Sequence, residues 1–107
     1  MIYLYHGILQ ENFESMKENG INPESFWGDE HEAIKYSDCN KMVRIDASKY
    51  TISPNFYVID TYIGTNADYE AIEAWKNSKK TWKDSLKIFG SVIVEERVFF
   101  DEDYDII

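Results

Sequence analysis

Strand-like and helix-like patterns alternate irregularly along this 107-residue chain, and their order restricts the fold more than any other feature. Short alternating apolar segments, typical of strands, are separated by segments with helical spacing. The strand segments do not recur as β-α-β units, which would favour a parallel sheet. We therefore expect an α+β fold with a split, mostly antiparallel β-sheet flanked by short helices. The chain is too short for two independent cores, so residues 1–107 are expected to form one domain.

The individual elements follow from local patterns. Gly20 and Gly90 stand where helices end, and Asp29 with Glu32 three residues later predicts a capping box at a helix start. Pro54-Asn55 predicts a turn between two strands. The predicted strands are 2–6, 24–27, 41–46, 57–62 and 91–100, the last kinked near Glu95-Glu96. The predicted helices are 10–19, 29–37 and 66–89, the last broken near Asn77-Ser78.

The charge balance limits the partners that the chain can bind. Twenty acidic residues against eleven basic ones give a net charge of −9. Such a surface repels phosphate backbones and anionic lipids, so we expect no direct nucleic-acid or membrane binding. An acidic face can instead bind a basic partner protein. The sequence shows no signal segment and no apolar run of about 18 residues, so we expect a cytoplasmic monomer.

Two residues near the N-terminus are candidates for chemistry. His6 ends the first predicted strand just before Gly7, where its ring could reach a cleft and bond a ribose hydroxyl or transfer a proton. Tyr36, on a short predicted helix, could stack on a planar heterocycle. Each also has a plainer interpretation as a packed residue, His6 bonded to a backbone carbonyl and Tyr36 half-buried between helix and sheet.

Two pairs of adjacent residues lie within strand-like segments. Because neighbours in a strand face opposite sides, one of Phe26 and Trp27 should be core and the other should face outward or into a cleft. The same alternation places Glu96 rather than Glu95 on the apolar face of the last strand. The alternative is a strand edge or bulge at which both glutamates reach water.

The histidines and the single cysteine do not form the patterns typical of a metal site or a reactive thiol. The two histidines lie far apart in the sequence, and His31 is interpreted as a solvated residue in the first turn of a helix. Cys39 is the one cysteine, so no internal disulfide forms, and its expected state is a buried or inert thiol. We expect no metal ion.

Four short motifs occur in order along the chain: Tyr5-His6-Gly7, Gly20-Ile21, Ala33-Ile34-Lys35-Tyr36 and Glu96-Arg97-Val98-Phe99-Phe100-Asp101. In this order they resemble the ADP-ribosyltransferase superfamily of the diphtheria-toxin and poly(ADP-ribose) polymerase type. The resemblance covers about the first 40 and the last 15 residues. Three positions differ from the usual family pattern. This chain has Ile8 where the family has Ser or Thr, Phe26 or Trp27 where it has a second Tyr, and Ala33 where it often has Ser.

The resemblance implies a role for each matching residue. His6 would hold the adenosine-side ribose of NAD, the Gly7 backbone would hold the nicotinamide carboxamide, and Tyr36 would stack on the nicotinamide ring. Phe26 or Trp27 would be the second aromatic contact. Glu96 would bind the nicotinamide ribose and stabilise the oxocarbenium-like transition state, because a carboxylate is favoured beside developing positive charge.

The implied function is transfer of ADP-ribose from NAD to a protein acceptor, with release of nicotinamide. A compact acidic chain of this composition would suit a phage or mobile-element product. The alternative, from another functional class, is a non-enzymatic acidic inhibitor or interaction protein that covers a basic partner surface. The charge favours this alternative, whereas the order of His6 and Glu96 favours the transferase.

Overall fold

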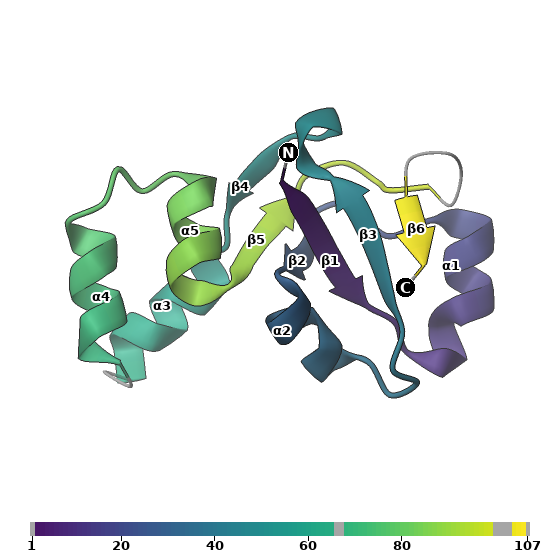
Figure 1. Ribbon diagram of the computed structural model, residues 1–107, viewed down its shortest axis with the longest axis horizontal. Helices are drawn as coiled ribbons and strands as arrows, with labels where there is room; N and C mark the ends of the chain where they lie inside the picture. The colour runs from purple at the N-terminus through teal and green to yellow at the C-terminus, as the bar shows by residue number, and fades with distance from the viewer. Residues whose placement is uncertain (1, 66–67, 100–103, 107) are drawn as a thin grey trace.

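The structure, a computed structural model, describes residues 2–65, 68–99 and 104–106. Within these residues six strands form one sheet in which all neighbouring strands are antiparallel (Figure 1). The predicted α+β class with an antiparallel sheet is confirmed. The strands lie in the spatial order β4 (Ile52–Pro54), β5 (Ser91–Val94), β2 (Ser25–Gly28), β1 (Tyr3–Gly7), β3 (Met42–Asp46) and β6 (Tyr104–Ile106).

The helices lie at the two ends of the sheet and beside its middle. Figure 1 shows a group of helices beyond β4 and β5 at one end, and α1 (Phe13–Asn19) at the opposite end near β6. The short helix α2 contacts both β1 and β2. The helices are α1 (Phe13–Asn19), which continues a 3₁₀ turn at Gln10–Asn12, α2 (Glu30–Ala33), α3 (Phe56–Thr65), α4 (Tyr69–Lys76) and α5 (Trp82–Phe89).

The sequence signals at the helix ends are confirmed in part. Gly90 ends α5 with a φ of 71° in the left-handed region, where an L side chain is disfavoured. Asp29 caps α2, its Oδ1 accepting a bond from the Glu32 amide at 2.8 Å. The reciprocal bond of a capping box is absent, because the Asp29 amide donates to the Gly90 carbonyl and the Glu32 carboxylate bonds to Lys35.

The prediction of a strand at 57–62 is wrong, because this segment belongs to helix α3. The β-favouring residues there are outweighed by a helix cap and by packing. Fully buried Asn55 accepts a bond from the Val58 amide at 3.3 Å and so starts the helix. Ile59 then packs against Trp75 and Phe89 from α4 and α5. The predicted break near Asn77-Ser78 does separate α4 from α5.

The predicted strand at 91–100 is shorter than expected. The strand β5 ends at Val94, and the chain then leaves the sheet at Glu95-Glu96, where the kink was predicted. Val98 rejoins an extended segment through an antiparallel bridge to Ile21. Phe100 at the end of this prediction, Asp101 at the end of the motif that begins at Glu96, and residues 66–67 of the predicted helical stretch lie outside the described residues.

The buried residues form two clusters. The larger one lies on the sheet, and the smaller one joins the three helices at the end of the molecule. The sheet cluster consists of Leu4, Ile8, Ile21, Trp27, Val43, Ile45, Ala47, Val92, Val94 and Val98, and the helical cluster consists of Ile59, Trp75 and Phe89.

Candidate functional site

The sheet opens between its two central strands. β1 pairs with β3 at five successive positions and β2 pairs with β5 at four, but β1 and β2 pair only at Tyr5 and Gly28. Beyond this point the His6 side chain joins β1 to β2, because its Nδ1 is 2.7 Å from the Phe26 carbonyl oxygen. The opening separates the end of β1 from the start of β2.

A cleft of about 820 Å³ lies at this opening. We call it the aromatic cleft, because its lining includes Phe26, Trp27, Tyr36, Tyr62 and Phe89. His6 and Gly7 also line it. The structure thus brings together, from β1, β2 and the turn after α2, five of the six residues to which the resemblance gave a contact with NAD; Glu96 is the sixth.

His6 is held in one tautomer by its neighbours. Because a carbonyl only accepts, the Nδ1–H donates to Phe26, and Nε2 of the neutral ring is left as an acceptor. Burial lowers the pKa of His6 below its ordinary value of 6.5, and the bond to Phe26 opposes this only in part. The ring lies 5.0 Å from the Trp27 ring, centroid to centroid. At neutral pH His6 therefore offers an uncharged acceptor nitrogen.

The two adjacent aromatics face opposite ways, as alternation predicted. Trp27 is 2% exposed and belongs to the core, with its indole N–H bonded to the Ser25 hydroxyl at 2.8 Å. Phe26 is 47% exposed and lies against Tyr57 of α3, with ring centroids 5.9 Å apart. Tyr36 is 66% exposed. Phe26 and Tyr36 thus offer accessible ring surface, whereas Trp27 forms part of the packed base.

Gly7 is required by a close backbone approach. A Cβ at this position would collide with the Ala33 carbonyl oxygen and lie 2.9 Å from the Tyr36 carbonyl carbon. Only a glycine therefore allows the turn after α2 to pack directly on the end of β1. This contact fixes the position of Tyr36 relative to His6.

Glu96 is placed elsewhere, and its expected position on the apolar face of the last strand is wrong. The strand has ended at Val94, so alternation no longer applies, and both Glu95 and Glu96 are exposed. The Glu96 carboxylate accepts bonds from the Thr51 amide at 2.9 and 3.0 Å and from its hydroxyl at 3.2 Å. Thr51 precedes the edge strand β4, and Glu96 does not line the aromatic cleft.

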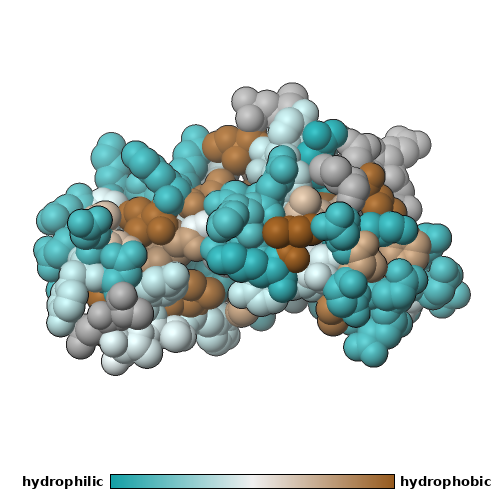
Figure 2. All heavy atoms as spheres, turned by 60° about the horizontal axis from the view of Figure 1, so that its bottom comes forward, coloured by the Kyte–Doolittle hydropathy of each residue, from teal (hydrophilic) through white to brown (hydrophobic). Residues whose placement is uncertain are grey.

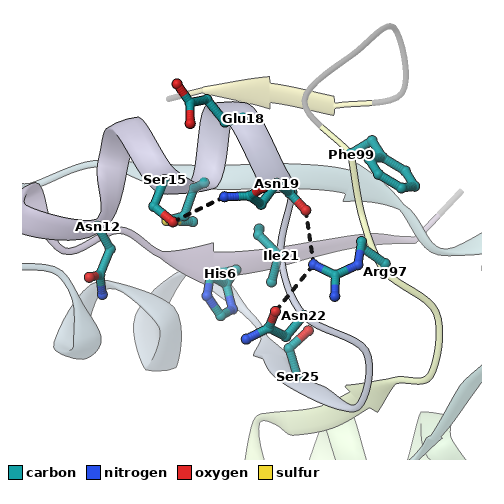
Figure 3. A pocket seen from close by; sticks show the side chains of 12 residues that line it. His6, Asn12, Ser15, Glu18, Asn19, Ile21, Asn22, Ser25, Arg97 and Phe99 are labelled. Carbon is teal, nitrogen blue, oxygen red and sulfur yellow. Dashed lines mark hydrogen bonds between the residues drawn. The ribbon is translucent and has the colours of Figure 1, made fainter.

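A second, more polar cleft of about 870 Å³ adjoins the first (Figure 3). We call it the polar cleft; Asn12, Ser15, Asn22, Ser25 and Arg97 line it, and His6 lies in both clefts. In the sequence, Arg97 was noted only as a member of the motif that begins at Glu96, and no binding role was predicted for it. Arg97 follows Glu95-Glu96 in an otherwise apolar segment, and this position could have marked it as a site residue. We considered only the two glutamates there.

The remaining candidate side chains lie outside this arrangement. His31 is exposed on α2, as predicted. Half-buried Cys39 directs its thiol to the Ile8 carbonyl oxygen at 3.3 Å. Within the described residues no three His, Cys, Asp or Glu side chains are grouped so as to hold a metal ion.

Comparison of the chain with models of protein families, with curated proteins and with solved structures finds no match. In the described part of the chain, no helix has the length and apolar character needed to span a membrane.

Proposed function

We propose that the chain binds NAD in the aromatic cleft and acts as an ADP-ribosyltransferase-like protein, transferring ADP-ribose to a protein acceptor and releasing nicotinamide. One observation carries the proposal. The opening between β1 and β2 gathers His6, Gly7, Phe26, Trp27 and Tyr36 around one cleft of about 820 Å³. These residues come from three separate segments, and the resemblance had assigned each of them to the same ligand.

The accessible groups of the cleft match the parts of such a ligand. Tyr36 and Phe26 expose ring faces on which a nicotinamide or adenine can stack. The Nε2 of neutral His6 can accept a bond from a ribose hydroxyl. The Gly7 backbone lies at the cleft wall, where the resemblance places the nicotinamide carboxamide. Binding would thus rest on stacking and on neutral hydrogen bonds.

The transfer step also needs a carboxylate beside the opening glycosidic bond. If Glu96 supplies it, the carboxylate must leave Thr51 when NAD binds. The aromatic cleft has carboxylates of its own in Glu24, Glu32 and Asp38. Glu32 already contacts Lys35 at 2.8 Å, which leaves this carboxylate partly neutralised. Replacement of Glu96 and of Glu32 by Gln separates the two possibilities.

Binding is tested by isothermal titration calorimetry with NAD. We expect saturable binding to the unmodified protein, weakened about tenfold or more by Tyr36→Ala, because a stacked aromatic ring contributes about 1–3 kcal/mol per base. Tyr69→Ala is the matched control, since Tyr69 is 70% exposed on α4 and lies outside the aromatic cleft. Equal weakening by both variants, or no binding of NAD at all, would contradict the proposal.

Turnover is tested by nicotinamide release from labelled NAD, with and without lysate. We expect Glu96→Gln to abolish release while preserving the fold and NAD binding, if Glu96 acts in transfer. Thr51→Ala is the control for the structural contact, because it removes one bond to Glu96 and keeps the amide. Loss of release in Glu32→Gln alone would assign the catalytic carboxylate to the cleft itself.

A second candidate function is a non-enzymatic acidic protein that covers a basic partner surface. The placement of Glu96 outside the cleft and the net charge of −9 both favour it. Figure 2 shows a mainly hydrophilic face whose apolar side chains lie in separate small groups. Such a face suits polar, charge-led association. Absence of both NAD turnover and any thermal shift with NAD would favour this candidate.

A further inference from the structure

Arg97 stands out as a guanidinium that is held in place at the polar cleft and pairs with no carboxylate among the described residues. Its Nη1 donates to the Asn19 carbonyl at 2.9 Å and to the Asn22 side-chain oxygen at 3.2 Å. Both acceptors are neutral, and Arg97 forms no ion pair with any residue in the described part of the chain. Because both bonds use Nη1, the remaining guanidinium N–H groups can bond a ligand.

The surroundings of Arg97 suit an anion. Figure 3 shows Arg97 beside Asn22 at one end of the polar cleft, with Ser15 and Asn12 farther along its lining, the Ser15 hydroxyl bonded to Asn19. Side-chain amides and hydroxyls can donate to an oxyanion. Glu18 also lines the cleft, but its carboxylate points away from Arg97 in this view. A lone fixed arginine among neutral donors is unusual in a chain of net charge −9, where acidic neighbours are plentiful.

The polar cleft is continuous in its lining with the aromatic cleft. His6, Asn12, Met16, Asn22 and Ser25 contribute to both. A ligand that stacks on Tyr36 and contacts His6 can therefore extend into the polar cleft, which Arg97 lines. Arg bonds phosphate with two parallel N–H groups, and such charge-assisted bonds are about twice as strong as neutral ones.

We propose that the polar cleft is a phosphate-binding subsite built on Arg97. This inference rests on the proposed function where the phosphate belongs to NAD, whose pyrophosphate would bond Arg97 while the nicotinamide end lies in the aromatic cleft. The same chemistry could instead bind a phosphate group carried by a separate ligand. The two sources differ in whether phosphate and aromatic ring must be joined in one molecule.

Calorimetric titrations with four probes test the proposal: NAD, ADP-ribose, nicotinamide riboside and inorganic pyrophosphate. The main variant is Arg97→Gln. The second is Ser15→Asp, which adds a carboxylate to the cleft and leaves the bonds of Arg97 to Asn19 and Asn22 intact. Lys17→Gln is the control for net charge, because exposed Lys17 on α1 lines neither cleft. Thermal unfolding of each variant verifies the fold.

We expect Arg97→Gln and Ser15→Asp each to weaken ADP-ribose and NAD about tenfold, in line with the loss of a charge-assisted bond, and to leave nicotinamide riboside unchanged. Lys17→Gln should change none of these affinities. Arg97-dependent binding of pyrophosphate, with no effect of either variant on NAD, would assign the subsite to a separate phosphate ligand.

Two outcomes would overturn the inference. NAD binding that is equal in the unmodified protein, Arg97→Gln and Ser15→Asp, with no binding of pyrophosphate, would remove the phosphate subsite and leave the proposed function intact. Absence of binding by all four probes would remove both. Arg97-dependent pyrophosphate binding without any binding of NAD would support the subsite and remove the proposed function.

Discussion

His6 has a structural role at the point where β1 and β2 separate, and it also supplies a hydrogen-bond acceptor to the candidate site. Its ring lies where the β1–β2 pairing stops, and its Nδ1–H replaces a backbone donor at the Phe26 carbonyl. The same bond leaves Nε2 as an acceptor on a residue that lines both clefts. Burial keeps the pKa below its ordinary value, so the uncharged form is the one that the folded state prefers.

This shift gives stability a definite pH dependence. Above pH 6.5 His6 is neutral in the folded and the unfolded chain, and its contribution to stability is complete. As the pH falls below 6.5 the unfolded chain binds the proton first, so the free energy of unfolding decreases until the lowered folded-state pKa is reached. Urea unfolding between pH 5.5 and 7.5 measures this slope.

The two histidines allow a matched comparison. His6→Asn should flatten the slope between pH 5.5 and 7.5, because the titrating group is gone. His31→Asn, at an exposed position on α2, should leave the slope as it is in the unmodified protein. An unchanged slope in His6→Asn would show that other groups set the pH dependence.

At the same scale, the sequence predicts a residue's orientation only where the chain stays in a strand. Alternation predicted that one of Phe26 and Trp27 lies in the core and the other faces outward, and this is confirmed because both residues lie within β2. The same rule failed for Glu96, since β5 ends two residues earlier and the bonds to Thr51 set its direction. Contacts between residues 45 positions apart leave no local signal.

Among the elements, α3 depends on buried polar contacts at its start. Asn55 and Ser85 are both 0% exposed. The backbone N–H of Asn55 donates to the Ser85 hydroxyl at 3.1 Å, and the side-chain Nδ2 of Asn55 donates to the Ser91 hydroxyl at 2.8 Å. Ser85 in turn donates to the Ser91 carbonyl at 2.6 Å. The network joins the start of α3 to α5 and β5.

We predict that Asn55→Ala lowers the free energy of unfolding by about 2–3 kcal/mol. The variant loses the helix cap at Val58 and leaves the Ser91 hydroxyl without its buried donor, and each loss is worth about 1 kcal/mol or more. Asn77→Ala, at an exposed position after α4, should cost less than about 0.5 kcal/mol. Chemical denaturation measures both. Equal effects would show that the network does not stabilise α3.

The network also explains why α3 was mistaken for a strand. Tyr57, Val58, Ile59, Thr61 and Tyr62 all favour strands, and no local feature outweighs them. Asn55 was interpreted as part of a turn, whereas its buried position and its distant partners make it a helix cap. Helices with exposed caps and clear apolar stripes, such as α5, were predicted from sequence because their signals are local.

At the scale of the whole molecule, a large excess of negative charge lies on a small protein, so its acidic side chains repel one another. The chain carries twenty acidic and eleven basic residues. Ion pairs such as Lys17–Glu14 and Lys76–Glu73 join exposed residues three apart on a helix, at 3.9 and 3.7 Å. Exposed pairs of this kind contribute little. The excess negative charge therefore acts against the compact state.

Screening should relieve this repulsion. We predict that raising NaCl from 20 to about 300 mM, which shortens the Debye length well below the dimensions of the molecule, increases the free energy of unfolding by about 1 kcal/mol and the unfolding midpoint by about 4 °C. A variant with Glu18→Gln, Asp60→Asn and Glu95→Gln neutralises three exposed acids and reduces the net negative charge from −9 to −6. Its midpoint should rise less with salt in differential scanning calorimetry. An equal rise in both proteins would show that salt acts through hydration and not through charge, and the acidic surface would then be free to serve binding without a cost to the fold.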